Sequence, residues 1–259
     1  MEFKFKKKYG QNFIKDKNII NNIINKSDID KETLVIEIGP GAGALTTEIQ
    51  KVAKNVLAYE IDEDLKEILE NKLGENTKVI FKDFLKANIL EDIKDYQYKK
   101  LYVVANLPYY ITTPIIVKLI EDKIPVDKIV VMVQKEVGNR FKAKPNTKEY
   151  NSLSIYLNYY FNITKILDIS RNVFIPKPNV DSIVIMLNKK EKKLYLKNES
   201  VFFKLVKDSF KYKRKTLKNN LKNYDLNKIE TILKKYNFSL ITRAEAIPIE
   251  VFVEIANEL

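Results

Sequence analysis

One stretch of the sequence, Ala105–Pro114, combines residue types that could recognise the amino group of a nucleobase. The side-chain oxygen of Asn106 accepts hydrogen bonds, and Leu107 and Pro108 follow it with backbone carbonyls. Tyr109 adds an aromatic face on which a planar base could stack. The stretch therefore favours a site that accepts hydrogens from a planar amine. It also fits a strand end, a proline turn and a helix start.

A glycine-rich turn predicts a ligand that contains a nucleoside. Gly39, Gly41 and Gly43 lie between a predicted strand and a predicted helix, where a tight turn lets the backbone approach a ligand. Glu60 ends the next predicted strand, 21 residues after Gly39, where a carboxylate could accept hydrogen bonds from ribose hydroxyls. The turn also satisfies a relaxed dinucleotide fingerprint, so NAD remains an alternative ligand.

Two further acids favour S-adenosylmethionine over NAD. Glu37 comes two residues before Gly39, where a carboxylate suits a cationic amino-acid group better than a pyrophosphate. Asp83 follows the third predicted strand and could hydrogen-bond an adenine amino group. S-adenosylmethionine carries a ribose, an adenine, an ammonium and a sulfonium, and it has no phosphate. The sequence therefore predicts S-adenosylmethionine as the cofactor.

Strand and helix patterns alternate through about the first 150 residues. Such alternation is typical of a parallel sheet with helices on both faces. Two later β-like runs, at 163–169 and 180–187, predict an antiparallel pair at the sheet edge. The alternating strands are predicted at 34–38, 56–60, 79–81, 101–105 and 129–133, and the helices at 18–26, 44–52, 63–73, 113–121 and 135–141.

The composition excludes several classes of chemistry. The chain has 259 residues, 45% of them hydrophobic, and it contains neither cysteine nor histidine. A cysteine nucleophile, a histidine base and Cys/His zinc or iron–sulfur sites are therefore excluded, and we expect no metal. The lack of disulfides fits a cytoplasmic location. The lysine-rich first residues lack the apolar region of a signal peptide, and the longest uncharged run is interrupted by prolines, so we expect no membrane span.

Positive charge is concentrated near the C-terminal part of the chain. Residues 189–222 contain 13 Lys or Arg against three acids, whereas the whole chain has a net charge of +12. Such clustering predicts a polyanionic partner. If 202–222 is a single helix, six lysines share one face: Lys204, Lys207, Lys211, Lys215, Lys218 and Lys222. The opposite face would then carry Phe202, Val206, Phe210, Leu217 and Leu221. A break near Lys213 would instead divide the helix and could rotate one half against the other. We therefore predict two domains, 1–188 with a basic N-terminal arm and 189–259 with helices that bind RNA.

Five stretches, in order along the chain, resemble the rRNA adenine N6-dimethyltransferase family. Glu37–Gly43 and Asn106–Tyr109 resemble its methyltransferase motifs, and Phe174–Ser182 resembles its target-base loop. Tyr9–Ile14 resembles its N-terminal motif, and Ser209–Leu221 resembles the C-terminal domain of the KsgA (RsmA) branch. That branch dimethylates two adjacent adenosines near the 3′ end of small-subunit 16S rRNA. The resemblance implies a Rossmann-like class I methyltransferase domain with a mostly parallel seven-stranded sheet, a small all-α C-terminal domain, and a monomer.

The resemblance also assigns roles to individual residues. It implies that Tyr109 and Phe174 flank the flipped adenine, although Phe174 could equally be a core residue of an edge strand. Asn106, Leu107 and Pro108 would serve the target amine. The cofactor contacts implied by the resemblance and by the acids together are Asn12, Ile14, Glu37, Gly39, Gly41, Gly43, Glu60, Asp83 and Asn106. The RNA contacts would be Lys211, Arg214, Lys215, Lys218 and Lys222.

Two alternative functions remain at this point. One is dimethylation of large-subunit 23S rRNA, which confers macrolide resistance; Leu107 and the segment 213–221 favour the small-subunit branch instead. The other is a non-catalytic RNA-binding or assembly factor on the same fold, and the intact cofactor motifs speak against it. The absence of cysteine also counts against cytosine-C5 methylation, which needs a thiolate nucleophile.

Overall fold

A computed structural model of the chain describes residues 13–14, 16–107, 111–191 and 193–259. The predictions for Asn12, Pro108 and Tyr109 therefore lie outside the described residues. No helix in these ranges is long and apolar enough to cross a membrane.

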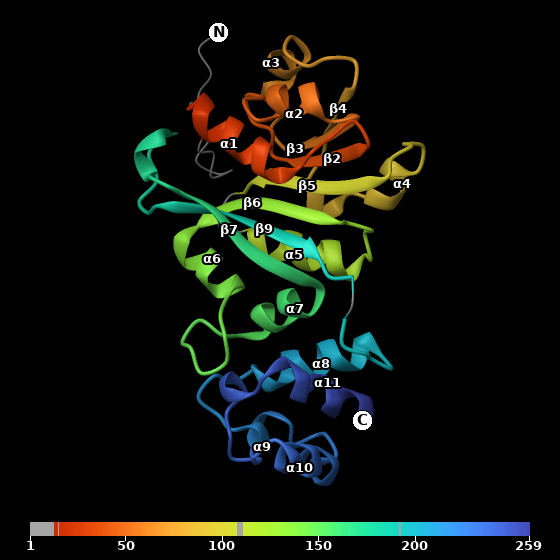
Figure 1. Cartoon of the computed structure of the whole chain (residues 1–259), viewed down its shortest axis with the longest axis vertical. Helices are drawn as coiled ribbons and strands as arrows, with labels where there is room; N and C mark the ends of the chain where they lie inside the picture. Colours follow the sequence, from red (N-terminus) through yellow and green to blue (C-terminus); the bar gives the residue numbers. More distant parts are fainter. Residues whose placement is uncertain (1–12, 15, 108–110, 192) are drawn as a thin grey trace. The chain divides into compact units, whose positions relative to one another are not determined.

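Seven strands form one sheet in the order β4-β3-β2-β5-β6-β9-β7 (Figure 1). The pairs β2–β3, β3–β4, β2–β5 and β5–β6 are parallel, and β6–β9 is antiparallel. This confirms the mostly parallel seven-stranded sheet and the pair of later strands at its edge. The strands are β2 (Thr33–Ile38), β3 (Asn55–Glu60), β4 (Thr77–Phe81), β5 (Lys100–Asn106), β6 (Lys128–Gln134), β7 (Phe161–Ile169) and β9 (Ser182–Lys189).

The central strands are apolar on both faces because helices cover both. Every residue of β2 is buried, as expected for a parallel strand inside an α/β layer structure. On one face, Ile20, Ile23 and Ile24 of α1 pack in a single cluster with Val35 of β2 and neighbouring strand residues. The helices of this part are α1 (Lys17–Ser27), α2 (Thr46–Val52), α3 (Lys66–Glu70), α4 (Ile89–Ile93), α5 (Thr112–Glu121) and α6 (Lys135–Phe141), with short 3-10 turns η2 (Glu63–Leu65) and η3 (Phe84–Lys86).

Contacts divide the chain into two compact units. The described residues up to Gly138, together with Thr164–Lys189, form the first unit, and Asn139–Ile163 with Lys190–Leu259 form the second. The C-terminal helices thus share their unit with α7 (Ser152–Tyr160), a helix that the sequence patterns did not predict. Its start is fixed by Asn151, whose side chain accepts from the backbone N–H groups of Leu153 and Ser154. The domain boundary at 188/189 stays a prediction.

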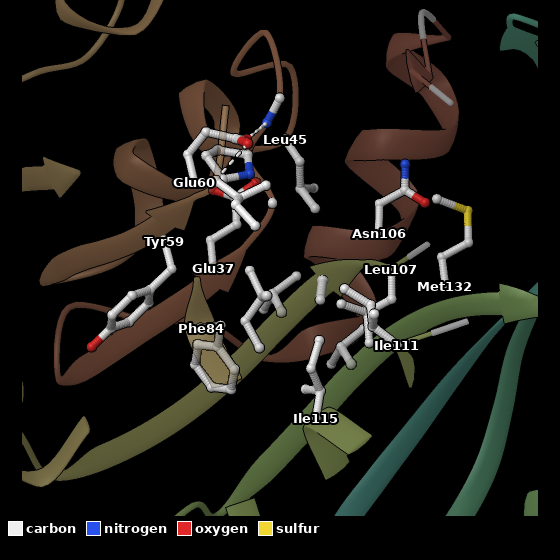
Figure 2. A pocket seen from close by; sticks show the side chains of 18 of the residues that line it. Glu37, Leu45, Tyr59, Glu60, Phe84, Asn106, Leu107, Ile111, Ile115 and Met132 are labelled. Atoms are coloured by element: carbon white, nitrogen blue, oxygen red, sulfur yellow. Dashed lines mark hydrogen bonds between the residues drawn. The ribbon is translucent and has the colours of Figure 1, made fainter. Parts of the chain in front are cut away.

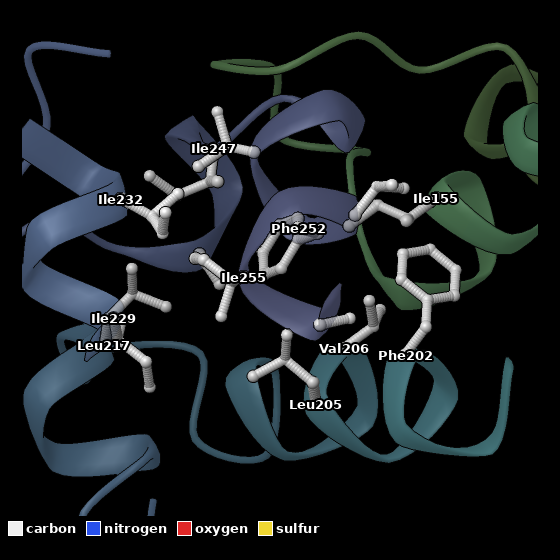
Figure 3. Packing of buried hydrophobic residues seen from close by; sticks show 14 of the residues in the cluster. Ile155, Phe202, Leu205, Val206, Leu217, Ile229, Ile232, Ile247, Phe252 and Ile255 are labelled. Carbon is white, nitrogen blue, oxygen red and sulfur yellow. The ribbon is translucent and has the colours of Figure 1, made fainter. Parts of the chain in front are cut away.

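The second unit has its own apolar core. Phe202, Leu205, Phe252 and Ile255 meet Ile155 of α7 in this core (Figure 3). Its other elements are α8 (Glu199–Ser209), α9 (Leu217–Asn220), α10 (Leu226–Lys235), η5 (Ala244–Ala246) and α11 (Ile249–Glu258). Within 199–259, all of which the structure describes, there are helices and turns without a strand, as predicted.

The single helix considered over 202–222 does not form, and the chain is instead broken around Lys213, the other possibility that the sequence left open. Helix α8 ends at Ser209, and α9 begins only at Leu217. The side-chain amide of Asn220 donates to the backbone carbonyls of Ser209 and Tyr212 and accepts from the Tyr212 N–H. These bonds stabilise an irregular turn where a continuous helix would otherwise run. The six lysines therefore do not form one helical face, although Phe202 and Leu217, predicted on the opposite side, are buried.

Candidate functional site

A cavity of about 360 Å³ lies at the carboxyl edge of β2, β3, β4 and β5 (Figure 2). This volume and its largely apolar wall are typical of a small-molecule site. The predicted residues that line it are Ile14, Glu37, Gly39, Gly41, Glu60, Asp83, Asn106 and Leu107. The structure thus brings together residues from five separate stretches of the sequence. Gly43 and Phe174 are not in its lining.

Strand register explains why these residues meet. Ile38 of β2 pairs with Tyr59 of β3 and with Ala105 of β5. The following residues, Glu60 and Asn106, therefore end at the same edge as the glycine turn. Ligands of open α/β sheets bind at this edge, where the strands end and the loops to the helices begin.

The glycine turn has a backbone conformation that favours glycine. Gly39, Gly41 and Gly43 have φ values of +71°, +57° and +79°. A Cβ atom added to Gly39 would meet no atom within 4 Å, so the space beside this residue is open toward the cavity. A Cβ at Gly43 would lie 3.2 Å from Cδ2 of Leu69. Gly43 thus serves the packing of the chain itself, and its contact with the cofactor stays a prediction.

Glu60 joins the glycine turn to the loop after β3. One carboxylate oxygen, Oε2, accepts from the Gly41 N–H at 3.0 Å, and Oε1 accepts from the N–H groups of Ile61 and Asp62, each at 2.9 Å. Burial raises the pKa of Glu60, whereas the three backbone donors lower it. Because a carboxylate oxygen can accept two hydrogen bonds, Oε2 retains capacity for one more donor, such as a ribose hydroxyl.

Glu37 is the most unusual polar group in the cavity. Its side chain is 2% exposed, and its Oε2 atom has no hydrogen-bond partner among the described residues. Burial raises the pKa of Glu37 to about 8; the nearby Thr46 hydroxyl lowers the pKa and the charge of Glu60 raises it. A buried carboxylate without a partner is costly, so the site suits a cationic ligand group. It does not suit a pyrophosphate, whose charge would repel both carboxylates.

An aromatic wall lies beside the two acids. Tyr59 and Phe84 make an edge-to-face contact with ring centroids 5.2 Å apart, and both line the cavity. The Tyr59 hydroxyl donates to Asp92 at 2.8 Å, which turns it away from the cavity (Figure 2). The sequence patterns missed both aromatic residues, although Tyr59 directly precedes Glu60 and Phe84 directly follows Asp83. Asp83 itself is half-buried, and its side chain accepts from the Leu85 N–H at 3.0 Å.

Asn106 and Leu107 form the opposite side of the cavity. Figure 2 shows the Asn106 amide beside Met132, across the cavity from Glu60. Asn106 is the last residue of β5 and is half-buried, and Leu107 is 2% exposed. The cavity therefore presents carboxylates on one side and a side-chain amide on the other.

Phe174 is placed differently from the stacking role that the resemblance implies. It lies in the short strand β8 (Phe174–Ile175), which pairs antiparallel with β1 (Phe13–Ile14), and it is opposite Ile14. Phe174 is 3% exposed and belongs to the core cluster around Ile20. Because strand side chains alternate, the next residue, Ile175, is the exposed one, at 40%. The stacking role of Phe174 stays a prediction.

The predicted RNA-binding residues lie in and around the turn between α8 and α9. All five are exposed, and none of them forms an ion pair with another residue in the described ranges. They are Lys211, Arg214, Lys215, Lys218 and Lys222. Their positive charge is therefore available to a polyanion.

Comparisons with known proteins identify the family of the chain. The sequence profile of the family described as "Ribosomal RNA adenine dimethylase" matches residues 2–259. "Ribosomal RNA small subunit methyltransferase A" from Staphylococcus aureus strains JH9 and Newman is 52% identical over 227 residues, covering 86% of this chain and 76% of the relative.

Two solved structures are similar over almost the whole chain. A dimethyladenosine transferase from Plasmodium falciparum has a TM-score of 0.77 and 26% identity, covering 94% of this chain and 95% of its own. The 23S rRNA methyltransferase ErmE has a TM-score of 0.69 and 23% identity, and the match covers 95% of this chain and 99% of the ErmE chain. The second likeness bears on the fold alone. Together with the sheet order, these structures establish the class I methyltransferase fold.

Proposed function

Because the chain belongs to the ribosomal RNA adenine dimethylase family, we propose that it dimethylates N6 of two adjacent adenosines near the 3′ end of small-subunit 16S rRNA. The chain is an S-adenosylmethionine-dependent rRNA methyltransferase by family and fold. The small-subunit substrate is supported by the 52% identical relatives, whose name refers to that subunit. The observation that carries the proposal is one cavity lined by both Asn106 and Glu37, whose Oε2 atom has no hydrogen-bond partner among the described residues.

The donor groups of the cavity fit S-adenosylmethionine. Glu37 would pair with its cationic amino-acid part, and Glu60 Oε2 would accept from a ribose hydroxyl. Asp83, beside the ring of Phe84, would contact the adenine. The open space at Gly39 leaves room for the ligand against the backbone. Ile14 lines the same cavity, so its predicted cofactor contact is compatible with its position.

Asn106 would orient the target amine. When bound, S-adenosylmethionine supplies an electrophilic methyl group on its sulfonium. Adenine N6 is a poor nucleophile, since its lone pair is delocalised into the ring. Hydrogen bonds from N6 to the Asn106 oxygen and to the carbonyl of Leu107 or Pro108 favour a pyramidal nitrogen whose lone pair is available. Positioning and local electrostatics then provide most of the acceleration, and no strong base is required.

The target adenine must leave its stack to reach Asn106, at a cost of a few kcal/mol. Stacking on an aromatic ring returns about 1–3 kcal/mol per base. Tyr109, three residues after Asn106, is the first candidate for that ring. Phe174 would have to leave the core cluster in order to stack on the base, so it is the second candidate for this ring.

The exposed basic residues of the second unit would bind rRNA phosphates. Charge reversal at Lys211, Lys215 and Lys218 is expected to weaken binding to the small subunit and to flatten its salt dependence, because fewer counterions are displaced. An unchanged salt slope would remove these lysines from the interface. We also propose that the enzyme acts as a cytoplasmic monomer without a metal ion.

The large-subunit alternative rests on a weaker observation. The likeness to ErmE, at 23% identity, is a likeness of fold, and a shared fold does not by itself imply a shared substrate. The non-catalytic alternative predicts a degraded cofactor cavity, whereas here the predicted acids and two glycines of the turn line one cavity.

The reaction can be tested with labelled S-adenosylmethionine and unmodified small ribosomal subunits. We expect the wild-type protein to transfer label. Because Asn106 is also a predicted cofactor contact, we expect Asn106→Ala to bind the cofactor more weakly and, at saturating cofactor, to transfer label far more slowly. Cofactor binding is measured separately by calorimetry. If the wild-type protein transfers no label, the enzymatic proposal fails; if Asn106→Ala transfers at the wild-type rate, only the role of Asn106 fails.

A further inference from the structure

The second unit presents positive charge from a segment that the sequence patterns assigned to the methyltransferase domain. Residues 139–163 contain four Lys or Arg against a single acid. Lys142, Lys144 and Lys148 are exposed, and none of them forms an ion pair with another residue in the described ranges. These three residues, named here the α6–α7 lysines, lie in the loop between those two helices.

The loop is held in one conformation by hydrogen bonds within its own unit. Both the N–H and the hydroxyl of Thr147 donate to the Lys144 carbonyl, at 3.2 and 2.7 Å. Asn146 adopts a left-handed backbone with φ +65°, and its N–H donates to the Glu245 carbonyl at 2.8 Å. The buried hydroxyl of Tyr150 donates to the Ile247 carbonyl at 3.0 Å. The α6–α7 lysines therefore extend from a preorganised backbone.

The segment 240–247, which accepts hydrogen bonds from the α6–α7 loop, also accepts hydrogen bonds from α9. The N–H groups of Leu217 and Lys218 donate to the carbonyls of Thr242 and Leu240, each at 2.9 Å. The segment 240–247 thus contacts α9 at one end and the α6–α7 loop at the other, and the loop lies beside this segment in Figure 1. Its eight residues can span at most about 25 Å. Both basic groups are therefore within reach of one RNA duplex.

The chemistry of the loop favours a phosphate backbone over a protein partner. A protein interface needs a buried apolar centre. Within 142–149, by contrast, the hydrophobic or ring-bearing residues are only Ala143 and Pro145, both partly buried already. Arg243, in the segment 240–247, adds a further exposed positive charge. Its Nη1 atom lies 3.8 Å from Oε1 of Glu245, which is a long distance for an ion pair.

We infer that the α6–α7 lysines form a second phosphate-binding surface, which binds the rRNA together with the basic turn around α9. This inference rests on rRNA as the partner of the proposed function. It enlarges the RNA-binding surface beyond the helices after residue 199. Because each phosphate contact displaces its own counterions, the contributions of the two groups to the salt dependence should add.

The test uses the full-length protein and fluorescently labelled, unmodified small ribosomal subunits. Binding is measured across a range of salt concentrations for the wild type and for a triple variant, Lys142→Ala, Lys144→Ala and Lys148→Ala. Each phosphate contact contributes about 0.7–0.9 to the slope of log K against log salt concentration, so the triple variant should lose about 2 from it. Replacing the same three lysines by arginine should retain the slope.

A matched control is available in α10 of the same unit. Lys228 donates to the Glu258 carbonyl, Lys234 lies 3.7 Å from Glu230, and Lys235 lies 2.6 Å from Glu254. Changing these three lysines to alanine removes the same net charge from residues that already have partners. We expect that control to keep the wild-type slope. Equal slopes in the two triple variants, or no loss in the α6–α7 variant, would overturn the inference.

The proposed function is tested independently in the same preparations. Methyl transfer by the wild-type protein reports on the function, whereas the difference in slope between the two triple variants reports on the surface. Active wild-type enzyme with an unchanged α6–α7 slope refutes the surface alone. Absence of both rRNA binding and transfer in the wild type refutes the function itself.

Discussion

Glu37→Gln is expected to stabilise the cofactor-free protein while it weakens cofactor binding. The substitution keeps the shape of the side chain and removes a buried charge whose Oε2 atom has no hydrogen-bond partner in the part of the chain that the structure describes. The pKa of Glu37 is raised from an ordinary 4.5 to about 8, mainly by burial. The folded state therefore holds the proton more tightly than the unfolded chain. The stability contributed by this group is fully present below about pH 4.5 and is lost as the pH rises through about 8.

The size of the effect follows from the shift. A change from 4.5 to about 8 corresponds to about 5 kcal/mol of lost stability at strongly alkaline pH. Between about pH 6 and about pH 8.5 the wild-type protein should lose about 2–3 kcal/mol through this group. The glutamine variant has no such loss. The raised pKa of Glu60 acts in the same direction, but it is present in both proteins and largely cancels from their difference.

The free energy of unfolding of both proteins is measured with urea, without cofactor, at about pH 6 and about pH 8.5. S-adenosylmethionine binding to both proteins is measured by calorimetry at the higher pH. The advantage of the variant should grow with pH, and its affinity for the cofactor should fall. Glu67→Gln is the matched control, because Glu67 is exposed on α3. A stability difference that does not change with pH, together with unchanged cofactor affinity, would refute the account of Glu37.

Three further predictions concern the glycines and the aromatic residues. Gly39→Ala should destabilise the fold by about 1–2 kcal/mol through its positive φ and should also weaken cofactor binding, measured by urea unfolding and calorimetry. Gly138→Ala places a Cβ atom 2.3 Å from Cδ1 and 2.7 Å from Cγ1 of Ile183. The substitution should therefore lower the free energy of unfolding by about 1–3 kcal/mol in the wild type and by much less in an Ile183→Ala background. Equal losses in the two backgrounds of this double-mutant cycle would contradict the clash. Tyr109→Ala and Phe174→Ala should each retain cofactor binding and lose methyl transfer, and unchanged turnover in both would exclude stacking by these rings.

Sequence patterns predicted the acids and glycines that line one side of the cavity because each signal is local. Glu37 and Gly39 are separated by one residue, and Glu60 ends an apolar run that is readily identified as a strand. Parallel pairing in register then brings these separate strand ends to one edge of the sheet. Tyr59 and Phe84 were missed because a buried aromatic residue next to an acid has no spacing signal of its own.

Other features depend on contacts between residues that are far apart in the sequence. The break after Ser209 depends on the side chain of Asn220, eleven residues later, which no helical periodicity indicates. The burial of Phe174 depends on its pairing with Ile14. Likewise, the α6–α7 loop joins the second unit through the bond from Asn146 to Glu245, so its lysines could not be assigned to that unit from charge patterning.

The central claim is tested most directly by identifying the methylated product. Unmodified small ribosomal subunits and protein-free large-subunit rRNA are incubated in parallel with the protein and S-adenosylmethionine, and the nucleosides are identified by mass after digestion. We predict N6,N6-dimethyladenosine, two residues per small subunit, and none in the large-subunit RNA. Dimethyladenosine in the large-subunit RNA, or none in either substrate, would contradict the account.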